Sequence, residues 1–209
     1  MTQGAAGTST ITGVLAGAGT FQFNGGSASE QLSLVTPFSA SGLTLKLTGG
    51  TLLLSGAGTF AFGTIDITGN TVIDFGAANS TLTSTSLRIA SGATVTVKNH
   101  AAGLDFWYAS GSLVNLNAAG SAVTSTLNPP GDFQGVAPLT AISFNSSPTT
   151  GTDYTGLTVT WFSGTGEIRP VPEPSTYGAM LMAGCAGLFG FRRWRAKRRA
   201  APGAVEIGS

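Results

Sequence analysis

An alternation of apolar with polar or small residues runs from residue 43 to residue 97, and it limits the possible folds more than any other feature of this chain. It is plain in Leu43-Thr44-Leu45-Lys46-Leu47, Ile65-Asp66-Ile67 and Ile73-Asp74-Phe75. A period of two places alternate side chains on opposite faces of a β-strand, whereas an amphipathic helix repeats every 3.6 residues. We therefore predict strands centred near residues 45, 53, 61, 66, 73, 88 and 96, and no amphipathic helix before Ser175.

Short phrases in this region recur at fixed distances. Residues 17–23 return 39 residues later as residues 56–62, and Ala90-Ser91-Gly92 returns 19 residues later at residues 109–111. Offsets near 20 and 40 suit one and two turns of a three-sided solenoid, in which each coil buries its apolar side against the next. We predict an all-β, right-handed parallel β-solenoid over residues 1–128, with an antiparallel β-sandwich as the alternative. The residues expected inside are Ile65, Ile67, Ile73, Phe75, Leu87, Ile89, Val95 and Val97.

The phrase from Gly50 to Gly58 reads Gly-Thr-Leu-Leu-Leu-Ser-Gly-Ala-Gly. With it, the stretch from Leu47 to Val97 resembles the strand repeats of autotransporter-associated passenger proteins. The resemblance implies the same parallel β-solenoid.

The pattern of residues changes after residue 128. Residues 128–131 (Asn-Pro-Pro-Gly) form a strong turn signal, and two further apolar segments follow at residues 142–144 and 157–162. We predict that residues 129–170 supply terminal strands, which cap the exposed edge of the solenoid, and then a linker.

Three blocks follow one another near the C-terminus: Val171-Pro172-Glu173-Pro174, an apolar stretch from Ser175 to Phe191, and a basic cluster. The cluster consists of Arg192, Arg193, Arg195, Lys197, Arg198 and Arg199. The two prolines of the first block prevent a helix from beginning before Ser175. Residues 175–191 make roughly 25 Å of helix, slightly less than the ~30 Å hydrocarbon core. We predict a single transmembrane helix over about residues 175–194 and a disordered tail at 200–209.

These blocks, in this order, resemble the PEP-CTERM sorting signal of Gram-negative bacteria, which membrane proteases of the exosortase group process. The resemblance covers residues 171–199. It implies that Val171, Pro172, Glu173 and Pro174 form the sorting motif, that an exosortase-type protease is a partner, and that the precursor resides transiently in the inner membrane.

Charge predicts the orientation of that precursor. Up to Phe191 the chain has four Lys and Arg against eight Asp and Glu (4 − 8 = −4), whereas from Arg192 on it has six against one (6 − 1 = +5). Because basic segments stay on the cytoplasmic side, we expect a cytoplasmic C-terminus, a body outside the membrane, and later release to the cell surface or medium. The first residues lack a charged and apolar signal peptide, so we expect the natural start to lie upstream of Met1.

The composition argues against an enzyme. Charged residues make up 9% of the chain, against about 25% in typical soluble domains. The single histidine, His100, excludes a multi-histidine metal site, and neither H-E-x-x-H nor G-x-S-x-G occurs. We expect no catalytic residues, no metal and no cofactor. We also expect no nucleic-acid partner, because the basic cluster adjoins an apolar span and the body offers no basic surface.

Two interpretations would give the body a chemical role. Asp66 and Asp74 could face each other from adjacent strands as paired carboxylates, although we favour solvated surface positions for both. In Asp105-Phe106-Trp107-Tyr108, three consecutive aromatic residues cannot share one face of a strand. We therefore take Trp107 and Tyr108 as candidate ligand-stacking residues, with core packing as the competing interpretation, and His100 could hydrogen-bond Asp105 locally. The sequence predicts an exported, non-enzymatic surface or extracellular-matrix protein; the alternative is a carbohydrate-binding or carbohydrate-active β-helix protein with an extracellular polysaccharide as partner.

Overall fold

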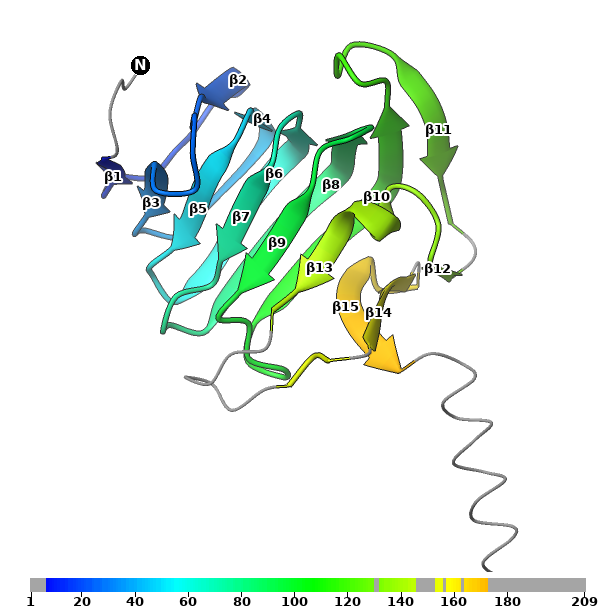
Figure 1. Cartoon of the computed structure of the whole chain (residues 1–209). Helices are drawn as coiled ribbons and strands as arrows, with labels where there is room; N and C mark the ends of the chain where they lie inside the picture. The colour runs from blue at the N-terminus through cyan, green and yellow to red at the C-terminus, as the bar shows by residue number, and fades with distance from the viewer. Residues whose placement is uncertain (1–6, 130–131, 146–152, 156, 163, 173–209) are drawn as a thin grey trace, which may run out of the picture. The chain divides into compact units, whose positions relative to one another are not determined.

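The structure is a computed structural model that describes residues 7–129, 132–145, 153–155, 157–162 and 164–172. These residues fold into a β-solenoid in which the chain passes alternately through two sheets (Figure 1). One is a sheet of short strands, here called the short-strand sheet: β1 (Thr8–Ile11), β3 (Gln31–Leu34), β5 (Gly50–Leu54), β7 (Thr71–Asp74), β9 (Val95–Lys98) and β13 (Ile142–Phe144). All its neighbouring strands are parallel.

The other sheet, here called the long-strand sheet, begins with five parallel strands: β2 (Ala18–Phe23), β4 (Phe38–Leu47), β6 (Gly58–Ile67), β8 (Ser80–Ala90) and β10 (Phe106–Leu116). Consecutive strands such as β6 and β7 lie in different sheets, so Ile65 and Ile73 do not form a hairpin. The parallel solenoid is therefore confirmed, and the antiparallel sandwich is wrong for the described residues.

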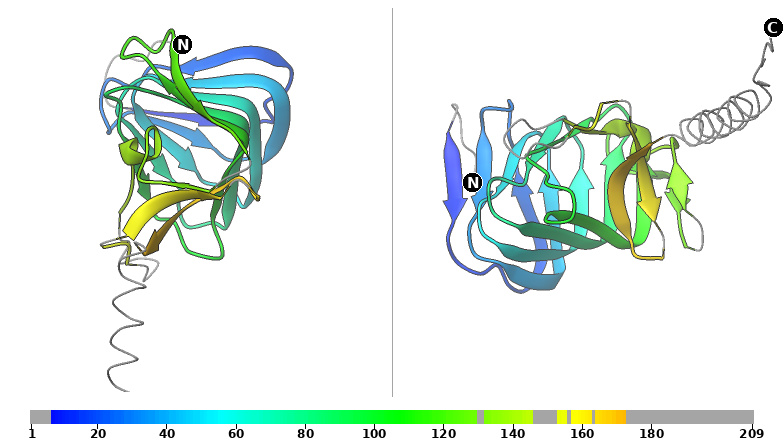
Figure 2. Two further views of the ribbon diagram at one scale, coloured as in Figure 1. Left: turned by 90° about the vertical axis from the view of Figure 1, so that its right-hand side faces the viewer. Right: turned by 90° about the horizontal axis from the view of Figure 1, so that it is seen from below.

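The long strands β4, β6, β8 and β10 bend in the middle and so supply two sides of each coil, as the end-on view in Figure 2 (left) shows. The pairing register shifts at the bend. The segments before the bend, the first arms, are residues 38–40, 58–62, 80–84 and 106–109; the second arms are residues 43–47, 64–67, 86–90 and 112–116. At the bend of β6, a Cβ on Gly63 would lie 2.0 Å from the carbonyl oxygen of Ser41, so only glycine fits. The strands predicted separately near residues 61 and 66 are thus the two arms of β6.

Register shows which residues are equivalent from coil to coil. Thr20, Thr44 and Thr64 are stacked, which corresponds to advances of 24 and 20 residues per coil. The offset near 20 is close to these advances, but the repeated phrase does not mark equivalent positions. Two coils on from Thr20 lies Thr64, and not Thr59, its counterpart in the phrase. Similar Gly- and Thr-rich phrases fall on different sides of the coil, so their likeness does not mark equivalent positions.

The core lies between the two sheets. All eight residues predicted to be inside have no exposed surface: Ile65, Ile67, Ile73, Phe75, Leu87, Ile89, Val95 and Val97. Buried residues of the first arms form a second apolar row of Phe38, Phe60, Leu82 and Trp107. Each strand contributes every second side chain to this shared core, which explains why apolar residues alternate so regularly in the sequence.

Antiparallel strands cover the C-terminal end of this stack. They are β11 (Val123–Leu127), β12 (Phe133–Gln134), β14 (Leu157–Phe162) and β15 (Glu167–Pro172), with a 3-10 helix at Leu139–Ala141. β11 pairs with the second arm of β10 and β15 with its first arm. Parallel stacking does not stop at residue 128, because β13 pairs with β9.

The predicted helix over residues 175–194 and the tail at 200–209 lie outside the described residues. Within the part of the chain that the structure describes, no helix is long and apolar enough to cross a membrane.

Candidate functional site

The sorting motif begins where the described body ends. Val171 is half-buried and Pro172 is the last residue of β15. The side chain of Ile168 on that strand is fully buried, so β15 is held against the solenoid. Glu173, Pro174 and the six cations of the basic cluster lie outside the described residues.

The two candidate carboxylates do not meet. Asp66 is on the second arm of β6, between Lys46 and Arg88 at stacked positions, and its Oδ1 lies 3.1 Å from Arg88 Nε. Asp74 is on β7 in the other sheet. The hypothesis of paired carboxylates is therefore wrong, because adjacent runs of the chain enter different sheets.

Each of these carboxylates has a structural partner. Burial raises the pKa of Asp66, and the nearby charges of Arg88 and Lys46 oppose that rise. Asp74 Oδ1 accepts hydrogen bonds of 2.8 Å from Gly76 N and from Asn99 Nδ2. A ladder of opposite charges stabilises neighbouring strands, so Lys46, Asp66 and Arg88 join three coils.

His100 is buried under the C-terminal end of the core. Its ring packs edge-on against Phe75 and Phe144, and its Nδ1 lies 2.6 Å from the hydroxyl of Tyr154. Burial lowers the pKa of His100 to about 4, and a hydrogen bond to the backbone of Asp105 opposes this only in part. The imidazole is neutral at pH 7 and serves as an aromatic plug rather than as an exposed base.

Asp105 joins two coils through its side chain. Its Oδ1 accepts a hydrogen bond of 2.8 Å from Ser80 N, and its Oδ2 accepts one of 2.8 Å from Ala101 N. Burial raises the pKa of Asp105, whereas these two backbone N–H groups lower it. The sequence pointed to a contact between His100 and Asp105, but it did not indicate that the carboxylate would bind the backbone of another coil.

The aromatic run divides as strand geometry requires. Trp107 points into the core with no exposed surface, so it cannot stack on a ligand, and core packing is the correct interpretation for this residue. Tyr108 and Phe106 point outward on the same face, with ring centroids 5.9 Å apart and planes inclined by 15°. Phe106 is the residue that sequence reasoning missed, although its i, i+2 spacing from Tyr108 was the signal for a shared face.

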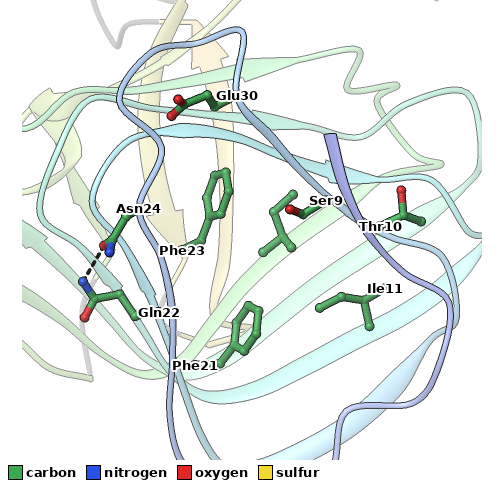
Figure 3. Close-up of a pocket in the computed structure, with 9 residues that line it drawn as sticks. Ser9, Thr10, Ile11, Phe21, Gln22, Phe23, Asn24 and Glu30 are labelled. Atoms are coloured by element: carbon green, nitrogen blue, oxygen red, sulfur yellow. Dashed lines mark hydrogen bonds between the residues drawn. The ribbon is translucent and has the colours of Figure 1, made fainter. Parts of the chain in front are cut away.

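A cavity of about 150 Å³ opens at the N-terminal end of the solenoid (Figure 3). Its walls are formed by Ile11, Phe21, Phe23 and Leu32, which end the apolar core on this side, and polar groups lie at the rim. Glu30 Oε2 at that rim accepts a hydrogen bond from Gly26 N. One carboxylate in an apolar opening is not a catalytic arrangement, and no group of three or more potential metal ligands occurs among the described residues.

Comparison with known proteins supports the interpretation of the tail alone. Residues 170–199 match the family model of the PEP-CTERM protein-sorting motif. No curated protein and no solved structure matches the chain. The resemblance of the body to autotransporter-associated repeats is not confirmed, because the matched residues do not include the stretch from Leu47 to Val97. The motif supports an exported protein that an exosortase recognises, with a membrane-anchored precursor.

Proposed function

We propose that the chain is a non-enzymatic surface or extracellular-matrix protein, whose C-terminal segment directs it to an exosortase-type protease. The match of residues 170–199 to the sorting motif carries this proposal. The precursor spans the inner membrane with its body outside and its basic cluster in the cytoplasm. Cleavage then releases the body to the surface or the medium.

The motif has a physical rationale. Pro172 and Pro174 preset an extended backbone, which reduces the entropy lost when the segment enters an extended-peptide groove. Glu173 between them offers one carboxylate to a basic group of the protease. The apolar span holds this short segment at a fixed height, and the basic cluster prevents the chain from being drawn through the membrane.

The state of the body's acidic residues favours a structural role over catalysis. Asp66 is paired with Arg88, Asp74 binds Gly76 and Asn99, and Asp105 binds two backbone N–H groups. A general acid or base needs a carboxylate that can reach a substrate proton. The stacked coils instead suit a rigid module that presents its outer faces.

Processing can be tested in a host that expresses a matching exosortase, with a signal peptide supplied before Met1. Mass spectrometry of the mature product should show a body that lacks the residues from Arg192 to Arg199. Glu173→Ala should leave membrane insertion intact and retain the tail, whereas Glu206→Ala, the same change beyond the basic cluster, should be processed normally. A mature wild-type protein that still carries the basic cluster would mean that the segment is only an anchor.

A further inference from the structure

The three outer faces of the solenoid differ in charge. The second arms carry Lys46, Asp66 and Arg88, and the short-strand sheet carries Asp74 opposite Lys98. The first arms carry no charged side chain. Their outward residues, here called the first-arm face, are Ser39, Thr59, Ala61, Thr81, Thr83, Phe106 and Tyr108.

Strand register arranges this face in two rows that cross the strands. One row runs from Thr59 through Thr81 to Phe106, and the other runs from Ser39 through Ala61 and Thr83 to Tyr108. Neighbouring members of a row are separated by the strand spacing of about 4.8 Å. The face is therefore a strip of hydroxyl and methyl groups that ends in two aromatic rings.

The aromatic pair is held rigidly. Trp107 between them is anchored in the core with no exposed surface, and β10 is paired on both sides, with β8 and with β15. The rings of Phe106 and Tyr108 lie nearly parallel, as the 15° angle between their planes shows. A platform of this kind loses little side-chain entropy when a ligand settles on it.

Two charged residues extend the platform on β15. Glu167 is paired with Tyr108 in the sheet, and its Oε2 lies 3.4 Å from Arg169 Nη1. The Arg169 guanidinium lies over the Phe162 ring, with Cζ 4.3 Å from the ring centroid. Its side chain is 48% exposed, so N–H groups at the edge of the guanidinium can reach a ligand. A cavity of about 130 Å³ lies beside them, between Phe106, Glu167 and Arg169 on one side and the loop of Ala102 and Gly103 on the other.

We propose that Phe106 and Tyr108, together with Glu167 and Arg169, bind a neutral polysaccharide whose chain continues along the first-arm face. Sugar rings present C–H groups on one face, which pack on an aromatic ring, and hydroxyls at the edge, which pair with a carboxylate and a guanidinium. Threonine and serine hydroxyls along the rows serve the following sugar units. Because Glu167 and Arg169 offset each other, the face carries no net charge to attract an acidic polymer. This proposal does not rest on the sorting reaction.

The test is affinity electrophoresis of the full-length, unprocessed chain in detergent, in native gels that contain hydroxyethylcellulose, dextran or galactomannan. At least one of these neutral polymers should retard the protein at low and at high salt. Alginate, an acidic polymer that the basic cluster of the unprocessed chain attracts, should retard it only at low salt. Tyr108→Ala and Phe106→Ala should each weaken binding by at least about fivefold, the loss expected when an anchoring aromatic residue is truncated. Tyr108→Phe keeps the ring and should retain most of the binding.

Phe21→Ala is the matched control, because it removes the same ring from the opposite end of the solenoid and should bind as the wild type does. Circular dichroism of each variant excludes loss of folding as the cause of lost binding. The proposal is overturned if none of the three neutral polymers retards the chain, if alginate retards it equally at high salt, or if the aromatic variants bind like Phe21→Ala. Exosortase processing is not involved, so either proposal can fail without the other.

Discussion

At the C-terminal end of the solenoid, β11 and β15 cover the two arms of β10, whereas at the N-terminal end β1 and β2 each pair with one neighbour among the described residues. The interiors differ accordingly. Trp161 and Ile168 close the C-terminal end with no exposed surface, but Ile11, Leu15 and Phe21 at the N-terminal end are only partly buried. A coil that lacks a neighbour cannot bury its apolar side, so stability should decline from the capped end towards the open end.

The largest expected effect is the loss of the Trp161 side chain at the capped end. Trp161 is fully buried, and its Nε1 donates a hydrogen bond of 2.9 Å to the carbonyl oxygen of Ala109. Trp161→Ala leaves a cavity and removes this hydrogen bond, so it should lower the free energy of unfolding by about 4 kcal/mol. Denaturant titration followed by circular dichroism measures this. A loss below about 1 kcal/mol would show that the cap contributes little and that the two ends are equivalent.

The next effect is a pH dependence that comes from His100. Burial places its pKa near 4 in the folded state, against 6.5 for the ordinary side chain. Between these values only the unfolded chain takes up the proton, so the contribution of His100 is complete above pH 6.5 and is lost as pH falls towards 4. The total loss should be on the order of 3 kcal/mol. The raised pKa of Asp105 has the opposite sign, because its contribution is lost as pH rises through the folded-state value.

Comparison with His100→Gln separates the pH dependence of His100 from that of Asp105 and the other acidic groups. Unfolding titrations at pH 7 and pH 4 should show a greater acid loss for the wild type than for the variant. If the wild type and the variant lost the same stability between pH 7 and pH 4, the pKa of His100 would not be lowered in the folded state. The imidazole would then be in contact with water at the capped end.

Much of this architecture was predictable from the sequence. The alternation around Ile65 and Ile73 indicates strands with buried apolar faces, because a period of two has one structural meaning. The Pro172-Glu173-Pro174 block, the apolar span and the basic cluster predicted the sorting motif, because each block is contiguous in the sequence. These patterns are contiguous in the sequence, so they can be recognised without knowledge of the fold.

Features that depend on contacts between coils were not predictable. Whether Trp107 or Tyr108 faces the core depends on which face of β10 packs against the interior, and a run of three aromatic residues does not mark that face. His100 meets Tyr154 from 54 residues away. The apparent repeat failed for the same reason, since Thr59 and Thr20 share a phrase but occupy different sides of the coil.

A smaller effect should follow from loss of the acidic clamp near the capped end. Asp105→Ala removes the acceptor of two backbone N–H groups, one of them 25 residues away at Ser80, and should cost about 2 kcal/mol. Glu30, the acid at the open end, receives its hydrogen bond from Gly26 within its own coil, so Glu30→Ala should cost less. Unfolding titrations of the two variants measure the difference. If Glu30→Ala proved the more damaging change, the clamp between coils would not be what strengthens the C-terminal end.

The smallest effect is expected at the open end itself. Phe21 lines the N-terminal cavity and is only partly buried, so Phe21→Ala enlarges a space that water already reaches and should cost about 1 kcal/mol. Phe60 is fully buried in the middle of the stack, and Phe60→Ala should cost about 4 kcal/mol for the same change in side chain. Unfolding titrations of both variants test the proposed gradient directly. Equal costs would mean that another segment or a second chain covers Phe21 in solution, and light scattering of the wild type would distinguish a dimer from a monomer.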